Sequence, residues 1–350
     1  MKDYSKNIIY NHQTVKEALE KLNALGSKDN LTLFVLNDKQ QLLATLTDGD
    51  VRRGLLAGKN IENTVDAVMF EQFRYLQKNN FTLDDIKELK KKEIELIPIL
   101  NGDKKIHRII DLSEKKTILP IDAVIMAGGM GKRLKPLTDN IPKPLLMIGD
   151  KPIMEHTIDR LNSFGVENIF ITINHFGDQI ENYFGDGGNK GLNINYVRED
   201  EPLGTIGSVA LIKEFSNDYV LVMNADLLTD IDFEDFFRTF IERKAEVIVA
   251  TIPYRITVPY AILETDDEQI LSLKEKPTYT YYSNAGIYLI KRERLNLIPK
   301  SKFYNATDLM EALINQKAKV AYYPILSYWQ DIGRLEDYHK AQEDIKHLKL

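Results

Sequence analysis

The stretch that most constrains the fold of this chain is Ile121–Ile153, where an apolar segment runs into a glycine-rich turn followed by basic residues. Residues 121–126 are mostly apolar and favour β structure, and residues 127–131 read Ala-Gly-Gly-Met-Gly. The pattern predicts a buried strand that ends in a phosphate-binding loop, because glycines let backbone N–H groups approach an anion. Further along, Lys143 lies between two prolines that restrict its backbone.

Two familiar phosphate loops do not fit this stretch. A Walker A loop needs Ser or Thr where the chain has Arg133, and a dinucleotide fingerprint needs a third Gly where it has Leu134. Taken alone, a Gly-Gly-x-Gly turn indicates only a strand-to-helix connection. Together with Arg133, Pro136-Leu137-Thr138 and Pro142-Lys143-Pro144, it resembles the signature of sugar-1-phosphate nucleotidylyltransferases, G-G-x-G-x-R-L-x-P-L-T followed by P-K-P.

Composition narrows the class of protein. A length of 350 residues predicts two or three domains, and 43% hydrophobic with 28% charged residues is typical of folded soluble proteins. The absence of cysteine excludes disulfides, thiolate metal sites and cysteine nucleophiles. A net charge of −6 argues against a nucleic-acid partner, and without a long apolar segment we expect a cytoplasmic protein with no membrane contact.

The N-terminal third contains an internal repeat. At an offset of 64 residues, LFVLNDKQQLLATLTDGD from Leu33 matches IPILNGDKKIHRIIDLSE from Ile97, which predicts a strand, a turn and a strand, made twice. Amphipathic stretches at 15–25 and 83–92 predict a helix before each copy. This third resembles a pair of CBS motifs, small modules that often sense adenine nucleotides.

The CBS resemblance implies that Thr47 and Asp50 hold a nucleotide ribose. The second copy has Asp111 and Glu114 at the matching positions, so we expect one adenine-nucleotide site per chain. A pair kept only for dimerisation or domain packing remains an equal alternative.

A polar link ending in Pro120 divides the chain, and we place a CBS pair at 1–117 and a nucleotidyltransferase domain at 118–350. The expected fold is α/β: a mostly parallel, Rossmann-like sheet with helices on both faces, preceded by an α+β tandem CBS domain. Its strands and helices are expected in alternation, with strands at 121–126, 168–173, 192–197 and 219–223 and helices at 152–164, 178–184, 208–215 and 233–242. Such sheets bind ligands at the carboxyl ends of their strands.

A second glycine-containing loop, EDEPLGTIGS at Glu199–Ser208, resembles the loop that covers the nucleobase in the family. By itself it would equally suit a turn in which Thr205 or Ser208 caps a helix. The resemblance implies nucleotide contacts from both loops, made by Ala127, Gly128, Gly129, Gly131, Lys132, Glu199, Pro202, Gly204 and Thr205.

Two carboxylates are candidates for a metal site. Asp226 follows an apolar strand, and a carboxylate at the end of a parallel strand can hold Mg²⁺ against a phosphate. Asp230 and Asp232 better suit the N-cap of the next helix. Asp331 lies in WQDIG, which resembles the family's W-x-D-I-G motif and implies that Asp226 and Asp331 are the metal ligands.

Two further motifs lie between these carboxylates. Glu275-Lys276-Pro277 resembles E-K-P, and Asn284–Tyr288 resembles N-x-G-I-Y, although alone they would indicate a solvated turn and a strand. The resemblance implies that Lys276 contacts the sugar phosphate, and that Glu275, Asn284 and Gly204 contact sugar hydroxyls.

These motifs predict nucleotidyl transfer, in which a sugar 1-phosphate attacks the α-phosphorus of an NTP and pyrophosphate leaves. The resemblance implies catalytic roles for Arg133, Lys143, Asp226 and Asp331. It leans towards mannose-1-phosphate guanylyltransferases, and the domain order is that of glucosamine-1-phosphate guanylyltransferases of legionaminic acid synthesis. We therefore expect GTP, with dTTP and UTP open, and a homo-oligomer. The rival hypothesis is a regulatory protein that binds nucleotides without catalysis.

Overall fold

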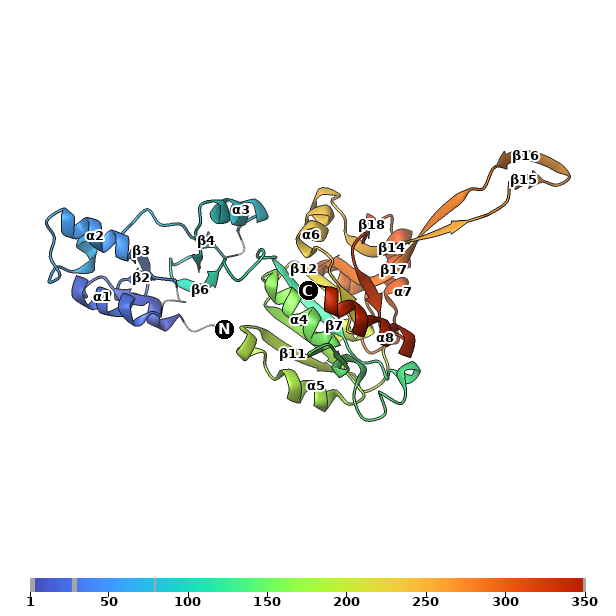
Figure 1. Cartoon of the computed structure of the whole chain (residues 1–350), viewed down its shortest axis with the longest axis horizontal. Helices are drawn as coiled ribbons and strands as arrows, with labels where there is room; N and C mark the ends of the chain where they lie inside the picture. The colour runs from blue at the N-terminus through green and yellow to red at the C-terminus, as the bar shows by residue number, and fades with distance from the viewer. Residues whose placement is uncertain (1–3, 27–29, 79, 349–350) are drawn as a thin grey trace. The chain divides into compact units, whose positions relative to one another are not determined.

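The computed structural model of the chain describes residues 4–26, 30–78 and 80–348. The chain divides into two compact units, Met1–Ile118 and Leu119–Leu350, and the division falls beside Thr117. In Figure 1 the first unit runs from blue to cyan and the second from green to red.

The first unit is built from two similar halves, each with a three-stranded sheet. In each half the first strand is parallel to the second, and the third is antiparallel to it. The strands are β1 Ile8–Tyr10, β2 Thr32–Leu36 and β3 Leu42–Thr47 in one half, and β4 Leu76–Gln77, β5 Leu96–Leu100 and β6 Ile106–Asp111 in the other. Strands β2 and β5, like β3 and β6, begin 64 residues apart, which confirms the predicted repeat of a strand, a turn and a strand.

The two hairpin turns are alike in detail. Asn37 Oδ1 accepts hydrogen bonds from the backbone N–H groups of Lys39 and Gln41, at 3.0 and 2.9 Å. Asn101 Oδ1 accepts the two matching bonds in the second half, at 3.1 and 3.0 Å. The same side-chain chemistry therefore shapes both turns.

Helices α1 (Val15–Ala24) and α3 (Leu83–Lys91) occupy the same place in the two halves, and each begins with a capping box. Helix α2 (Asp48–Leu56) follows β3 in the first half. In the described residues no helix follows β6 before the second unit begins. The two hairpins share one core, made by Phe34, Leu36, Leu42, Leu96 and Leu100.

The second unit contains a seven-stranded sheet in the order β11-β10-β7-β12-β17-β14-β18. Its strands are β7 Ile121–Met126, β10 Asn168–Ile173, β11 Asn193–Arg198, β12 Tyr219–Asn224, β14 Val247–Thr257, β17 Thr278–Lys291 and β18 Val320–Pro324. Strand β17 is antiparallel to both of its neighbours, whereas the other pairs are parallel. The predicted α/β class is confirmed, and the sheet is mixed because β17 returns from β14 through a hairpin.

The helices of this unit are α4 Ile153–Ser163, α5 Gly177–Phe184, α6 Phe233–Glu242, α7 Ala306–Asn315 and α8 Leu335–Asp344. The expected helix at 208–215 was wrong: only a short 3-10 turn, Gly207–Leu211, forms there. Ile206, just before the turn, and Val209 within it are buried in the core, and this packing overrides the local helical pattern. None of the helices in the described residues is long and apolar enough to span a membrane.

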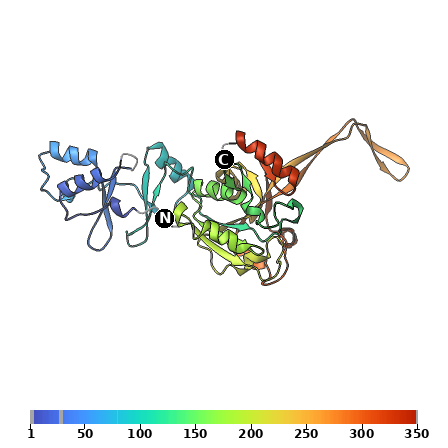
Figure 2. The ribbon, with the colours of Figure 1, turned by 60° about the horizontal axis from the view of Figure 1, so that its bottom comes forward.

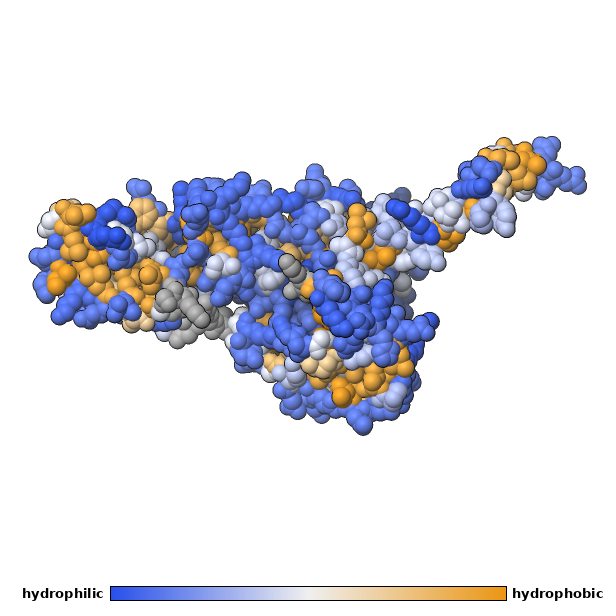
Figure 3. Space-filling model, viewed as in Figure 1, coloured by the Kyte–Doolittle hydropathy of each residue, from blue (hydrophilic) through white to orange (hydrophobic). Residues whose placement is uncertain are grey.

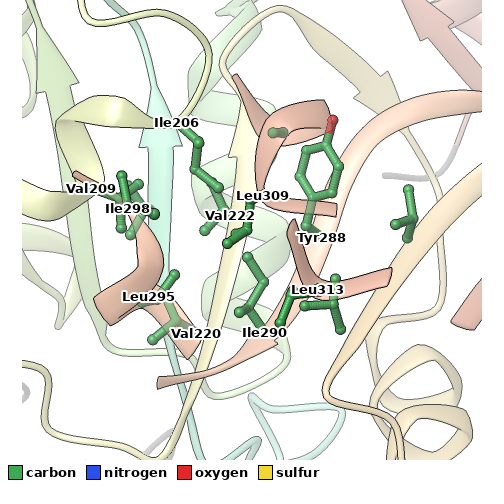
Figure 4. Packing of buried hydrophobic residues seen from close by; sticks show 14 of the residues in the cluster. Ile206, Val209, Val220, Val222, Tyr288, Ile290, Leu295, Ile298, Leu309 and Leu313 are labelled. Carbon is green, nitrogen blue, oxygen red and sulfur yellow. The ribbon is translucent and has the colours of Figure 1, made fainter. Parts of the chain in front are cut away.

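A hydrophobic core on one face of the sheet packs β12 against its neighbours (Figure 4). Val220 and Val222, two residues apart on β12, point to the same face. They meet side chains from β17, from the 207–211 turn and from α7, among them Ile290, Val209 and Leu309. The burial of each such side chain stabilises the folded state by about 1.5–3 kcal/mol.

Strands β14 and β17 continue beyond the sheet as a two-stranded extension. It carries a further pair, β15 Ile262–Asp266 and β16 Gln269–Lys274, at its end. Figures 1 and 2 both show this extension leaving the body of the unit. Because β14 and β12 run in the same direction, it leaves at the edge where β7 and β12 also end.

Candidate active site

The carboxyl ends of β7 and β12 lie side by side and bring the predicted loops together. In the sheet register Asn224 is opposite Met126, and Ala225 N donates to Met126 O at 3.2 Å. The glycine-rich loop follows β7, and Asp226 follows β12. The glycine-rich loop and Asp226 are about a hundred residues apart in sequence, but they are therefore close together in space.

The glycine-rich loop needs glycine at Gly131, which has a φ of 62°. A Cβ there would lie 3.0 Å from Thr138 Cγ2 and 3.1 Å from Lys143 Cβ. Thr138 is buried and donates from Oγ1 to Gly131 O at 2.9 Å, so it fastens the loop. Thr138 belongs to the motif quoted above, but the sequence alone does not indicate this role. Gly129, in contrast, has open space around it and presents its backbone freely.

A small sheet brings Asp331 beside Asp226. Strand β13 (Leu227–Thr229) pairs antiparallel with β19 (Trp329–Asp331), so that Leu227 is opposite Asp331. Ile332 N donates to Asp226 O at 3.0 Å. Trp329 Nε1 donates to Ala285 O at 3.0 Å and ties β19 to β17.

Lys143 lies between the two carboxylates. Its side chain is buried, its Nζ donates to Asp226 Oδ2, and the same nitrogen is 4.0 Å from Asp331 Oδ1. The guanidinium of Arg133 lies next to Gly333, where an added Cβ would be 3.4 Å from Nη2 and 3.7 Å from Asp331 Oδ1. The structure thus brings together the four residues predicted to be catalytic.

The carboxylates of Asp226 and Asp331 are short of hydrogen-bond donors. Oδ1 of each is shielded from solvent, and no hydrogen bond from the described part of the chain reaches either atom. Burial raises the pKa of Asp331, the charge of Asp226 raises it further, and Lys143 and Arg133 oppose the rise. Two carboxylates beside one lysine leave negative charge that a divalent cation would balance.

This donor set fits Mg²⁺, which binds through one or two carboxylates and keeps water or phosphate oxygens at its other positions. Among the described residues, no group of three or more histidine or carboxylate side chains could hold a metal by itself. A cation between Asp226 and Asp331 would therefore depend on substrate phosphates for further ligands.

Glu199 forms the other wall of the glycine-rich loop. Its side chain is buried, and Oε1 lies 3.2 Å from the point where a Cβ on Gly128 would be. Oε2 accepts one hydrogen bond, from Leu203 N at 3.3 Å. Ala127 is buried, whereas Lys132 and Pro202 are exposed.

Gly204 and Thr205 have structural partners in the segment before α7. A Cβ on Gly204 would lie 2.6 Å from Tyr304 O, so glycine is required for this close packing. Thr205 Oγ1 accepts a hydrogen bond from Ala306 N, the first residue of α7, at 2.9 Å. Thr205 thus satisfies an N–H group at the start of α7, whose N-cap is Asn305; the following helix that Thr205 was expected to cap does not form.

The sugar-side residues are divided between two places. Asn284 lies at the site edge of β17, where its Oδ1 accepts from Gly286 N at 2.9 Å and its Nδ2 donates to Tyr288 OH at 2.8 Å. Glu275 and Lys276 lie on the extension, beyond Thr278. Six residues of paired strand separate Thr278 from Asn284, or about 20 Å. The structure does not bring Glu275 and Lys276 to the other site residues, because β14 holds β17 extended.

In the first unit, Thr47 and Asp50 bind each other. The Asp50 carboxylate accepts from Thr47 N at 2.9 Å and from Thr47 Oγ1 at 2.6 Å, and these bonds cap α2. Its second oxygen accepts from Arg53 Nη2 at 2.5 Å. In the second half, Asp111 instead binds Ser113.

Comparison with known proteins places this geometry among related chains. Residues 122–347 match the family model described as nucleotidyl transferase. A D-glycero-alpha-D-manno-heptose 1-phosphate guanylyltransferase of Aneurinibacillus thermoaerophilus is 31% identical over 232 residues, which cover 65% of this chain and 99% of the relative. A UTP–glucose-1-phosphate uridylyltransferase of Synechocystis is 31% identical over 253 residues, or 65% of each chain. A mannose-1-phosphate guanylyltransferase of Mycobacterium tuberculosis is 31% identical, with 64% of each chain covered. The match thus spans about two thirds of the length of the last two relatives.

Two solved structures have a similar fold. One is a putative glucose-1-phosphate thymidylyltransferase from Bacillus anthracis, with a TM-score of 0.53, 23% identity, and coverage of 66% of this chain and 97% of that one. The other is HddC from Yersinia pseudotuberculosis complexed with GMP-PN, with a TM-score of 0.51, 26% identity, and coverage of 64% and 99%. Each likeness covers about two thirds of this chain.

Proposed function

The chain belongs to the nucleotidyl transferase family, and we propose that it transfers a nucleotidyl group from an NTP to a sugar 1-phosphate, giving an NDP-sugar and pyrophosphate. The observation that carries the proposal is the convergence of Lys143, Asp226 and Asp331 beside the glycine-rich loop. The relatives described above, named as sugar-1-phosphate guanylyltransferases and a uridylyltransferase, support the reaction class.

In this reaction a phosphate oxygen of the sugar 1-phosphate attacks the α-phosphorus of the NTP. The bond from the α-phosphorus to the bridging oxygen breaks, and pyrophosphate leaves with that electron pair. The attacking oxygen is already ionised near neutral pH, so no side-chain base is required. Catalysis then consists of positioning the reactants and stabilising the charge that develops.

The chain's own residues can supply both effects. Lys143 is buried, so its charge acts on the α-phosphate with little screening by water. Arg133, exposed at the mouth of the loop, can bind the departing phosphates through two N–H groups at once. The free backbone around Gly129 can approach phosphate oxygens closely.

Asp226 and Asp331 would hold Mg²⁺ through the oxygens that lack donors. The ion would neutralise phosphate charge and polarise the α-phosphoryl group. Lys143 then keeps the two carboxylates from repelling the incoming phosphates, because it partly neutralises Asp226.

We propose GTP as the nucleotide because of Glu199. Its buried carboxylate has one oxygen bonded to Leu203 N and the other beside Gly128. Guanine presents two neighbouring N–H groups, and the two oxygens of one carboxylate can accept a hydrogen bond from each. Uracil and thymine present a single N–H flanked by carbonyl oxygens, which a carboxylate repels. For the acceptor we propose glucosamine 1-phosphate or mannose 1-phosphate.

We also propose that the first unit is a CBS pair with one adenine-nucleotide site at Thr47 and Asp50. The repeated halves and their shared core support the pair. A ribose bound there would share a carboxylate that already accepts three hydrogen bonds.

The test is pyrophosphate release with Mg²⁺, a panel of four NTPs, and sugar 1-phosphates offered one at a time. We expect release with one NTP well above the others, and release at least about a hundredfold slower from Asp226→Asn. If no combination releases pyrophosphate while nucleotides still bind by calorimetry, the chain is a regulatory binding protein instead.

A further inference from the structure

We call the two-stranded extension of the second unit, residues 254–281, the arm. Its stem is the outer part of β14 and β17, from the pair Tyr254–Tyr281 to the pair Thr257–Thr278. Its tip is β15 with β16. About 14 residues separate the start of the stem from the turn, so the arm is roughly 40 Å long. An isolated two-stranded hairpin is only marginally stable in water, so its exposed surface calls for a partner.

Large apolar side chains are exposed along the arm, and Figure 3 shows them in orange at its tip. Leu263 and Leu273 are directly opposite each other, which places both on one face. Leu273 is 61% exposed, and the neighbouring Leu271 is 65% exposed. In the stem, the opposed Tyr254 and Tyr281 are 60% and 58% exposed.

The charges of the arm are separated along its length. The turn at the tip carries Asp266, Asp267 and Glu268. In the tip strands Lys274 is paired with Glu264, whose carboxylate also accepts from Ser272 Oγ. The stem side has the bases Arg255 and Lys276 against one acid, Glu275. The arm is therefore acidic at its end and basic nearer the sheet.

This distribution is complementary to itself when two arms lie antiparallel about a two-fold axis. The acidic tip of one arm then meets the basic stem of the other, and the same contact is made twice. The sheet of the second unit does not cover the arm, since the ladder between β14 and β17 keeps it extended.

We propose that the arm is a dimerisation element that packs antiparallel against the arm of a second copy of this chain. The tip leucines of each copy cover the stem tyrosines of the other, and each acidic tip lies near the other's Arg255. The interface is isologous and closes at two chains.

The first test measures mass against concentration by sedimentation equilibrium. We expect the full chain to dimerise, and Leu271→Glu with Leu273→Glu to raise the dimer dissociation constant by at least about a hundredfold, because four buried carboxylates would lack partners. The control is Leu326→Glu, the same change at a leucine outside the arm that is 85% exposed. Far-UV circular dichroism checks that each variant is folded. A single chain at all concentrations, or a double variant that dimerises as the full chain does, overturns the proposal.

The second test fixes the antiparallel arrangement by charge reversal. One variant carries Asp266→Lys and Glu268→Lys; Asp267 is kept because its φ of 45° suits few side chains. The other carries Arg255→Glu alone; Lys276 is also kept, because its φ is 40°. Each alone should dimerise at least about tenfold more weakly, and an equal mixture should regain the dimer, because tip and stem then carry opposite charges in the mixed pair. If the mixture stays as weak as its components, the arm does not pair in this way.

Discussion

The carboxylates of the two units differ in how completely the chain satisfies them. Asp50 in the first unit accepts three hydrogen bonds, all from its own helix start and Arg53. Asp226 and Asp331 in the second unit each keep a buried oxygen without a donor. A buried acceptor left without a partner costs folding free energy, whereas a satisfied one stabilises the fold. Asp50 therefore has a structural role within the chain. Asp226 and Asp331 instead keep acceptor oxygens available for a ligand that is not part of the chain.

The largest effect should come from removing charge at the unsatisfied pair. Asp226→Asn or Asp331→Asn should lower turnover by about 10²–10³-fold or more, because the shape is kept while the charge that balances a metal is lost. Pyrophosphate release measures turnover, and thermal unfolding should change little. Asp232→Asn is the matched control, since Asp232 is the N-cap of α6 and asparagine also suits an N-cap. Near-normal turnover in either site variant would remove the metal assignment.

Lys143 is the lysine that lies beside Asp226 and Asp331, so it partly balances their charge. Lys143→Met should lower kcat by about 10²-fold and change KM less, since its charge matters most as charge develops at the α-phosphate. Full kinetics in both substrates separate the two constants. Lys135→Met serves as the control, because Lys135 is exposed and paired with Asp139. An effect on KM alone would make Lys143 a substrate-binding residue.

Glu199 is intermediate, with one oxygen bonded and the other facing the loop. Glu199→Gln should reduce the preference for GTP over UTP by about 10- to 100-fold, because an amide replaces one of the two acceptors for guanine. Ratios of kcat/KM for the two nucleotides give the result. The wild-type preference must be measured first, and an unchanged ratio would show that Glu199 does not read the base.

The smallest effect should come from the satisfied carboxylate. Asp50→Ala should destabilise the first unit by about 1 kcal/mol, because it removes the carboxylate half of the α2 capping box while the Thr47 N-cap stays, and should leave turnover without effectors unchanged. Chemical denaturation and the turnover assay measure the two. Titrations of AMP, ADP and ATP into both chains would separate a cap from a nucleotide site. Binding that is lost in Asp50→Ala would show that the satisfied carboxylate also serves a ligand.

Much of the second unit was predictable because its signals are local. The apolar runs gave β7, β10 and β12 within a residue, and Asp232 was one of the two residues proposed for the α6 N-cap. The reversal of β17 was missed, since an apolar strand carries no mark of its direction. The helix expected at 208–215 failed because packing against α7 decided its shape.

The sequence predicts which residues form the candidate site better than it predicts how they are arranged. The motif spacing located Arg133, Lys143, Asp226 and Asp331, which the structure places together. It gave no sign that Gly204 packs on Tyr304 or that Glu275 and Lys276 lie on the arm, because those facts depend on long-range pairing. The hydrogen bond from Thr138 that holds the glycine-rich loop could not be predicted, because the sequence shows Thr138 only as one residue of the motif.

The pairing of β13 with β19 has a consequence for the order of events during synthesis. Asp226 and Asp331 become neighbours only through a contact between segments about a hundred residues apart. A ribosome emits the chain from its N-terminus, so the glycine-rich loop, Lys143 and Asp226 emerge well before Asp331 does. The nascent chain thus has a phosphate loop and a single carboxylate for the time needed to add that segment. The carboxylate pair is completed only after this later segment has emerged, and closing so long a loop is among the slower steps of folding.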